Sequence, residues 1–232
     1  MNSFKVLNGE LLFPLGISKI DEESFIDEDS LGLCIDRDSV TSIIIPESVT
    51  EIGPLAFDGF KQLEKLSIAN SVKSIGECAF RDCISLRDLF IPASVEYIAE
   101  DAFFCCSSLV SIIVDGGNSH YDSRNNCNAL IETATNKLIQ GSNTTIIPPS
   151  VEVISHSSFM DCISLERIEI PQSVTSIGPA AFWGCKNLKA LSFENPAVQI
   201  GDSAFKDTPY EDEYKTVFVS KRERRGRGSG WF

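Results

Sequence analysis

The chain has 232 residues, of which 43% are hydrophobic and 23% are charged. No run of roughly 18 apolar residues, the length that a membrane-spanning helix needs, occurs in it. The formal net charge is −13. An acidic surface repels phosphate backbones and anionic lipids, so the composition argues against nucleic acid as a partner and against membrane insertion. Residues 1 to 20 lack the form of a signal peptide, because the apolar run at 9–17 is short and contains a proline.

Residues 4–13, FKVLNGELLF, form the first predicted element. Apolar residues alternate on both sides of Asn8 and Gly9, a pair that adopts the positive φ angles of a tight hairpin turn. We expect this hairpin to cover the first edge of the structure, because an exposed strand edge is a template for aggregation. Residues 1–39 then comprise a cap hairpin and a degenerate first copy of the repeat that follows.

A repeat of 23 residues occupies residues 40–210. Its pattern is LxxIxIPxSVxxIGxxAFxxCxx, and its phenylalanines are Phe57, Phe80 and Phe103 and then Phe159, Phe182 and Phe205. A unit this short cannot bury its own apolar side, so neighbouring units must stack into one continuous core. The pattern predicts a solenoid of about seven coils, each with two short parallel strands and a short helical turn.

Glycine and proline mark fixed places in this repeat. Glycine follows the second predicted strand at positions 53, 76, 178 and 201, and we interpret it as allowing a backbone conformation that a Cβ would oppose. Proline ends the first predicted strand at positions 46, 92, 148 and 171, where no backbone donor is needed.

Four of the eight cysteines lie three residues after a repeat phenylalanine, at positions 83, 106, 162 and 185. A small side chain with a weak S–H donor suits a stacked interior, so we predict a ladder of reduced, buried thiols. Disulfides between neighbouring coils are the alternative. The remaining cysteines, at 34, 78, 105 and 127, form no CxxC pair. We therefore assign neither a metal nor a cofactor.

The step from Phe103 to Phe159 is 56 residues, which is one repeat plus 33. One coil therefore carries a 33-residue insertion near 115–147. Within it, residues 128–142 contain two apolar runs around 133–136, as expected for a β-hairpin that projects from the solenoid. Residues 211–232 are assigned to a terminal strand, at about 214–220, and a flexible basic tail.

These repeats resemble the BspA-type leucine-rich repeats, from about Ile17 to Phe205. That family is found largely in surface or secreted proteins of host-associated anaerobic bacteria and in some protists. The resemblance implies a leucine-rich-repeat solenoid that acts in adhesion or protein binding, with extracellular host proteins among its partners and a location at the cell surface or outside the cell. We expect a monomer.

Few residues suggest chemistry. The two histidines, His120 and His156, are 36 residues apart with no second ligand or base at a useful spacing, so we interpret both as solvated. If the insertion leaves the coils in register, Glu96 and Glu152 occupy the same site on adjacent coils, about 4.8 Å apart. Such a pair suits acid catalysis or a cation. The alternative is that both side chains point into water.

A surface patch is the better candidate. The outward residue of the first strand is apolar on three central coils, and the second strand adds two more apolar residues. The predicted protein-binding residues are Phe90, Tyr97, Ile113, Ile146 and Val153. Exposed apolar patches with a charged rim are common interaction sites. The alternative is that the inserted hairpin folds back over these residues.

A second row follows the repeat phenylalanine on three coils: Phe104, Met160 and Trp183. It is either a further exposed stripe or part of the packing between turns.

The leading hypothesis is a non-catalytic protein-binding module, because a repeat scaffold is present and a catalytic constellation is not visible. A carbohydrate-active enzyme that uses Glu96 and Glu152 is one alternative. A structural spacer within a longer surface protein is the other.

Overall fold

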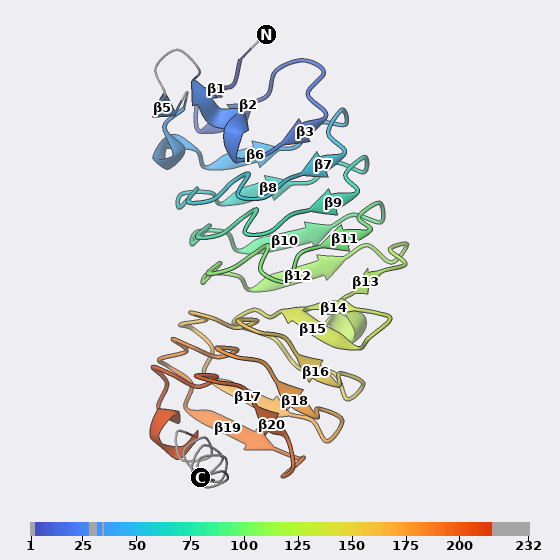
Figure 1. Ribbon diagram of the computed structural model, residues 1–232, viewed down its shortest axis with the longest axis vertical. Helices are drawn as coiled ribbons and strands as arrows, with labels where there is room; N and C mark the ends of the chain where they lie inside the picture. Colours follow the sequence, from blue (N-terminus) through green and yellow to red (C-terminus); the bar gives the residue numbers. More distant parts are fainter. Residues whose placement is uncertain (1–2, 28–31, 34, 215–232) are drawn as a thin grey trace, which may run out of the picture.

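The computed structural model describes residues 3–27, 32–33 and 35–214, and it is an elongated stack of about seven coils (Figure 1). Two rows of short parallel strands run along the stack. The first row consists of β6 (Ser42–Ile44), β8 (Lys65–Ser67), β10 (Asp88–Ile91), β12 (Ser111–Val114), β17 (Arg167–Ile170) and β19 (Ala190–Phe193). The second row includes β7 (Glu51–Ile52), β9 (Ser74–Ile75), β11 (Tyr97–Ile98), β16 (Val153–Ile154), β18 (Ser176–Ile177) and β20 (Gln199–Ile200).

The N-terminal cap contains the predicted hairpin. Strands β1 (Lys5–Leu7) and β2 (Glu10–Leu12) pair antiparallel, and Asn8 and Gly9 between them have φ angles of 51° and 82°. Strand β2 continues into a parallel pair with β6, and β3 (Lys19–Ile20) pairs with β7. The cap also contains η1 (Glu22–Phe25), β4 (Ile26–Asp27), β5 (Gly32–Leu33) and η2 (Arg37–Ser39). The hairpin therefore covers the first edge of the solenoid.

The repeat phenylalanines form the centre of the core. The rings of Phe57, Phe80 and Phe103 stack with centroids 5.2 and 5.3 Å apart, and a second stack joins Phe159 to Phe182 and Phe205. The two stacks belong to two separate clusters of buried residues. The insertion therefore divides the core, although the solenoid continues past it.

The predicted helical turns are not helical. A residue with positive φ lies two places after every repeat phenylalanine and two places before all of them except Phe103, as at Cys78 and Asp82 around Phe80. These left-handed residues turn the peptide groups along the solenoid axis, so the N–H of Phe80 donates to Ala102 of the next coil at 2.8 Å. The turns thus bond to one another much as strands do, which a helical periodicity in the sequence does not reveal.

The interpretation of the repeat glycines is also wrong. Positive φ angles among the described glycines occur at Gly9, Gly16, Gly59 and Gly184, and not at the glycines that follow the second strand. Those glycines are required by close approach instead. A Cβ on Gly76 would lie 2.7 Å from the backbone nitrogen of Pro54 in the preceding coil. The stacking distance between coils, and not a local dihedral angle, excludes a side chain there.

The cysteine ladder is confirmed. Cys83, Cys106, Cys162 and Cys185 are buried and free, and the thiols of Cys83, Cys106 and Cys185 each donate to the carbonyl of the repeat phenylalanine in the preceding coil at 3.1 to 3.4 Å. The alternative of disulfides between these coils is therefore wrong. Cys34 lies outside the described residues.

The inserted hairpin is present but does not project. Strands β14 (Leu130–Glu132) and β15 (Lys137–Gln140) pair antiparallel, β13 (Tyr121–Asp122) pairs with β14, and β15 pairs parallel with β16. All three strands thus lie in the second row, between the upper and lower coils (Figure 1). The short helix η3 (Arg124–Asn126) joins β13 to β14.

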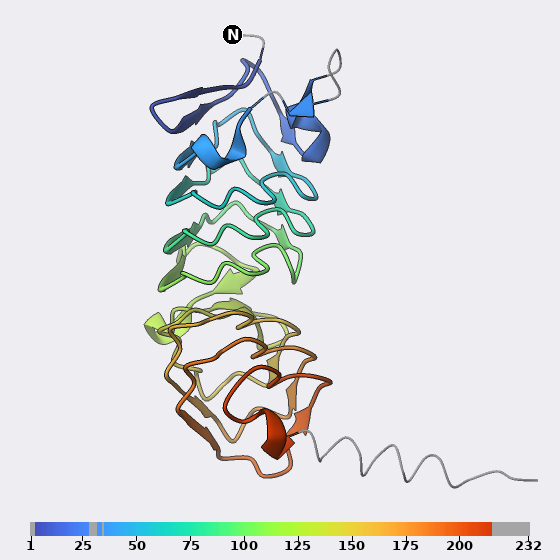
Figure 2. The same ribbon diagram turned by 90° about the vertical axis from the view of Figure 1, so that its left-hand side faces the viewer.

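On the opposite side of the stack the inserted coil is shortened. Gly141 takes the place of a repeat phenylalanine, since its N–H donates to the Ser158 carbonyl at 2.8 Å as a phenylalanine does in a regular coil. A Cβ on Gly141 would lie 2.0 Å from Cε1 of Phe159. The inserted coil therefore has the extra strands β13 and β14 in the second row and a shortened turn at Gly141. Figure 2 shows the whole stack from the side.

At the C-terminal end, Tyr210 and Tyr214 pack against the second cluster of buried residues. Residues 211–214 are helical, and Tyr214 packs on Phe193 and Phe205 with ring centroids 5.6 and 4.9 Å apart. Most of the predicted terminal strand, and the whole basic tail, lie outside the described residues. Within the described chain, none of the helices has the length and apolar character needed to cross a membrane.

Candidate interaction face

Phe90 and Ile113 stand next to each other on the outer face of the first strand row. They are direct partners in the parallel pairing of β10 and β12, and their side chains are 46% and 52% exposed. Their neighbours Leu89 and Ile112 are buried in the core. The strand alternation therefore fixes which side chains point outward, and two large apolar groups are held side by side on a hydrogen-bonded ladder.

Tyr97 is a further exposed aromatic residue on the coil that contains Phe90. It is the first residue of β11, it is 58% exposed, and its partner across the ladder is Ser74. Phe90, Tyr97 and Ile113 thus lie on two consecutive coils just above the insertion.

The other two predicted residues lie at the end of the insertion, at Ile146, and beyond it, at Val153. The N–H of Ile146 donates to the carbonyl of Cys127 at 3.1 Å, so the segment around Cys127 separates Ile146 from β12. Val153 pairs with Lys137 of β15, which lies between it and the coil of Tyr97. Ile146 is 76% exposed. The structure thus leaves the large apolar residues uncovered by the hairpin but divides the predicted patch into two parts.

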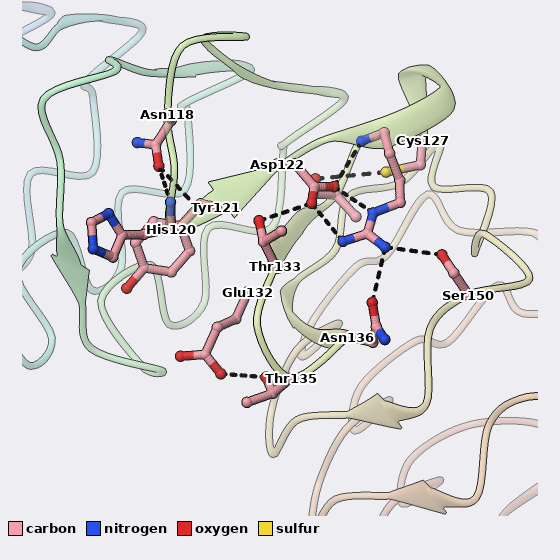
Figure 3. Close-up of polar contacts among 12 residues, drawn as sticks. Asn118, His120, Tyr121, Asp122, Cys127, Glu132, Thr133, Thr135, Asn136 and Ser150 are labelled. Carbon is pink, nitrogen blue, oxygen red and sulfur yellow. Dashed lines mark hydrogen bonds and ion pairs between the residues drawn. The ribbon is translucent and has the colours of Figure 1, made fainter.

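A polar network fixes the insertion between these parts (Figure 3). The guanidinium of Arg124 forms an ion pair with Asp122 and also donates to Asn136 at 2.9 Å and to Ser150 at 3.1 Å. Thr133 donates to the same carboxylate at 2.9 Å. The hydrogen bonds and charge of Arg124, together with the hydroxyl of Thr133, lower the pKa of Asp122 although burial acts to raise it. The network joins β13, η3 and the turn between β14 and β15 to Ser150 of the next coil.

The predicted pairing of Glu96 with Glu152 is wrong. The N–H of Glu152 donates to the carbonyl of Asn136, so β15 supplies the neighbouring site that the prediction gave to Glu96. The amide of Asn136 donates to Glu152 at 3.0 Å, and Lys73 forms an ion pair with Glu96 at 2.8 Å. The hydrogen bond and charge of Lys73 lower the pKa of Glu96. The insertion adds a strand between the two glutamates, so they form no carboxylate pair.

Glu100 is the centre of a polar cluster that the sequence analysis did not predict. Its carboxylate accepts hydrogen bonds from Lys137 and from the buried hydroxyl of Ser155, and it lies 3.2 Å from Nδ1 of His156. These residues come from three coils that the insertion brings together. Glu100 and His156 each lie three residues before a repeat phenylalanine, so the repeat gives them equivalent positions on their coils. Lys137 belongs to the insertion and has no counterpart in the pattern, so its contact with Glu100 had no signal in the sequence.

The second apolar row packs between turns. Phe104, Met160 and Trp183 are half-buried, and the sulfur of Met160 lies 3.8 Å from that of Cys105. The indole N–H of Trp183 donates to Asp207, and the ammonium of Lys206 lies 4.0 Å from the ring centroid. The structure therefore favours the packing interpretation of this row over the exposed stripe.

The thiols and the possible metal ligands of the described residues were compared with what a nucleophile or a metal site requires. Burial raises the pKa of the Cys105 thiol to about 12, and that of Cys185 to about 12, which disfavours the reactive thiolate. Within residues 3–27, 32–33 and 35–214, no three His, Cys, Asp or Glu side chains are grouped so that they could hold a metal ion.

The comparisons with known proteins identify the repeat. The family model for the BspA type leucine rich repeat region, with six copies, matches residues 33–140 and 131–215. No curated protein sequence matches the chain significantly. Leucine-rich repeat proteins of this kind generally bind proteins and are generally not enzymes.

Among solved structures, the pneumococcal vaccine antigen PcpA aligns with a TM-score of 0.61 at 19% identity, over 82% of this chain and 55% of that one. A leucine-rich repeat protein of T. pallidum aligns with a TM-score of 0.45 at 25% identity, over 92% of this chain and 78% of that one. The likeness to PcpA shows the shared fold, and this chain spans about half the length of that protein. Because the family model matches most of its residues, the chain belongs to the BspA-type leucine-rich repeat family.

Proposed function

We propose that the chain is a non-catalytic protein-binding module and that Phe90, Ile113 and Tyr97 form the centre of its interaction face. The observation that supports this proposal most is the direct pairing of two large, half-exposed apolar side chains on neighbouring strands. The ladder already fixes the backbone that carries them, so little backbone entropy is lost on binding. Aromatic residues in such patches often contribute most of the binding energy.

The surroundings of this face suit a protein partner. Asp88 and Ser111 form the next outward-facing pair on the same two strands, and the ion pair of Lys73 with Glu96 lies beside Tyr97. An apolar centre with a polar and charged rim is the usual composition of a protein interface. Adhesion, with extracellular host proteins as partners, is the specific form of the proposal that the family favours.

The experiment is affinity capture with the purified chain, from extracellular host proteins and separately from a lysate of the source cell. We expect the double variant Phe90→Ala/Ile113→Ala to bind the captured partner about tenfold more weakly or worse, because truncating a central apolar contact commonly costs more than 1 kcal/mol. Capture from the extracellular proteins supports adhesion, whereas capture from the lysate alone supports an intracellular scaffold.

The chain provides a matched control. Ile84 and Ile163 are 42% and 47% exposed, close to the values of the tested pair, but they lie on the turns that precede the first strands. The double variant Ile84→Ala/Ile163→Ala should bind as the wild type does. Equal binding by the Phe90→Ala/Ile113→Ala variant, or equal loss in both double variants, would contradict the proposed face.

A further inference from the structure

One edge of β17 has no backbone partner. In the parallel pair of β17 with β19, the carbonyls of Glu166 and Ile170 accept from the next coil, so Arg167 and Glu169 face the preceding coil. Among the described residues, no hydrogen bond joins the N–H or C=O of Arg167 or Glu169 to that coil. The segment opposite contains Ile146, which lies 23 residues before Glu169, and its N–H likewise faces its own preceding side, where it donates to the Cys127 carbonyl at 3.1 Å.

Other interrupted strand edges in this protein are closed by hydroxyl groups. The Tyr121 hydroxyl accepts from the N–H of Ile98 at the end of the upper second row, at 2.7 Å. Ser123 accepts from Val114 on the free edge of β12, at 3.0 Å. The Tyr210 hydroxyl accepts from the N–H of Leu191 in β19, the last strand of the first row, and donates to the carbonyl of Lys189 just before that strand. These contacts satisfy groups that would otherwise recruit another strand.

The free edge of β17 borders a groove. The groove has a volume of about 400 Å³, with Ile146 and Ile147 on one side and Arg167, Glu169 and Glu194 on the other. The edge of β10 that faces β8 also lacks ladder bonds, but those two strands lie against each other. At β17, unpaired backbone groups, apolar side chains and open volume occur together.

We propose that this groove binds an extended segment of a partner protein, which adds as a strand to the Arg167–Glu169 edge of β17. The inference rests on the proposed protein-binding function and adds a second contact on the far side of the insertion. Backbone groups of the segment pair with those of Arg167 and Glu169, and one apolar side chain packs on Ile146. Two carboxylates against one guanidinium line the groove, in a chain of net charge −13, so the segment carries basic residues.

The first test concerns the free edge and needs no partner. Amide hydrogen exchange of the full chain should show the N–H of Glu169 exchanging on the order of 100-fold faster than that of Ser192, its ladder partner on β19. The variant Glu169→Pro should keep the wild-type melting temperature, because it removes a donor that has no partner. Ser192→Pro should lower it, because that donor lies inside the ladder. Equal protection of the two amides would overturn the proposal.

The second test uses defined peptides. The probe is an acetylated and amidated heptapeptide of alternating lysine and valine, titrated into the isotope-labelled full chain. We expect saturable changes in the NMR chemical shifts of the backbone amides of Arg167 and Glu169. We also expect binding about tenfold weaker for the same peptide with alternate N-methylated residues, which cannot donate to a strand. A glutamate and valine heptapeptide should also bind more weakly.

Two variants separate this inference from the proposed function. Ile146→Ser removes the apolar contact at an exposed position of the groove without adding a charge and should weaken peptide binding about tenfold, whereas Phe90→Ala/Ile113→Ala should leave it unchanged. Absence of saturable shifts, or equal binding of the N-methylated peptide, overturns the groove proposal. If partner capture depends on Phe90 and Ile113 but not on Ile146, the interaction face stands and the groove proposal fails.

Discussion

At the residue scale, the repeat position determines the role of each side chain. The cysteines are buried because each follows a phenylalanine by three residues, where the thiol meets a carbonyl of the preceding coil. Glycine is required where two coils come closest, as at Gly178, where a Cβ would lie 2.5 Å from the backbone nitrogen of His156. Gly141 is the extreme case, because it faces a ring instead of another backbone.

The first prediction concerns Gly141. Its replacement by alanine forces a methyl group into the ring of Phe159, so we expect the free energy of unfolding to fall by about 1–3 kcal/mol, the usual cost of overpacking a core. Gly116→Ala is the matched control in the same coil, since a Cβ there meets nothing within 4 Å. Urea unfolding of both variants measures the difference. An unchanged midpoint for Gly141→Ala would show that Phe159 moves aside without cost.

At the element scale, the insertion replaces repeat contacts with side-chain contacts. Regular turns bond to each other through the backbone, and the shortened turn at residues 140–143 adds the side-chain hydrogen bonds of Asn143 to its two backbone bonds, from Gly141 to Ser158 and from Asn143 to Leu109. Its amide donates to the carbonyls of Ser107 and Leu109 at 2.8 and 3.0 Å, and its carbonyl accepts from Ser164 at 3.0 Å. One side chain thus joins the coils above and below the insertion.

The second prediction follows from these three hydrogen bonds. Asn143→Ala leaves the Ser107 carbonyl and the Ser164 N–H without their partner, whereas the Leu109 carbonyl keeps the backbone N–H of residue 143. We expect a loss of about 1–2 kcal/mol of stability. Asn187→Ala is the control, because that amide makes a single hydrogen bond, to the Ile163 carbonyl, at an exposed site. Chemical denaturation of both variants decides the point. A loss for Asn143→Ala no larger than that for Asn187→Ala would contradict the bridging role.

At the scale of the whole molecule, a polar seam crosses the solenoid. The buried polar residues of the described chain all lie between positions 140 and 158, namely Gln140, Ser142, Thr145, Ser155 and Ser158. This seam lies where the two apolar clusters meet, so polar contacts hold the halves together in place of stacked rings. Glu100 is the charged member of that junction, since it contacts Lys137 and His156 on the lower side.

The third prediction uses the charge of Glu100. Burial acts to raise its pKa, but the hydrogen bonds of Lys137 and Ser155 and the charges of Lys137 and His156 together hold the pKa below its ordinary value. Because the folded-state pKa is the lower one, the stabilisation is present above the unfolded pKa of about 4.3 and is lost as the pH falls through the folded value.

Glu100→Gln should therefore reduce stability at pH 7, and the difference from wild type should close as the pH falls below about 4. We expect no more than about 1 kcal/mol, because the side chain is 38% exposed and solvent screens its contacts. Urea unfolding at pH 7, 5 and 3 measures this. Glu166→Gln, at an ion pair that is 67% exposed on the glutamate side, is the control with little expected effect. A difference that is constant with pH would exclude the charge as its cause.

The sequence by itself determined the solenoid, the cap hairpin, the thiol ladder and the outward positions of Phe90 and Ile113, because a 23-residue period repeats the same local contacts in every coil. Only the tertiary structure decided how the turns bond, why glycine is needed, and that Glu96 and Glu152 do not meet. It also divided the predicted patch, opened the groove at β17 and gathered partners around Glu100. These features depend on where the insertion lies between coils, and a segment that occurs once has no period from which its place can be predicted.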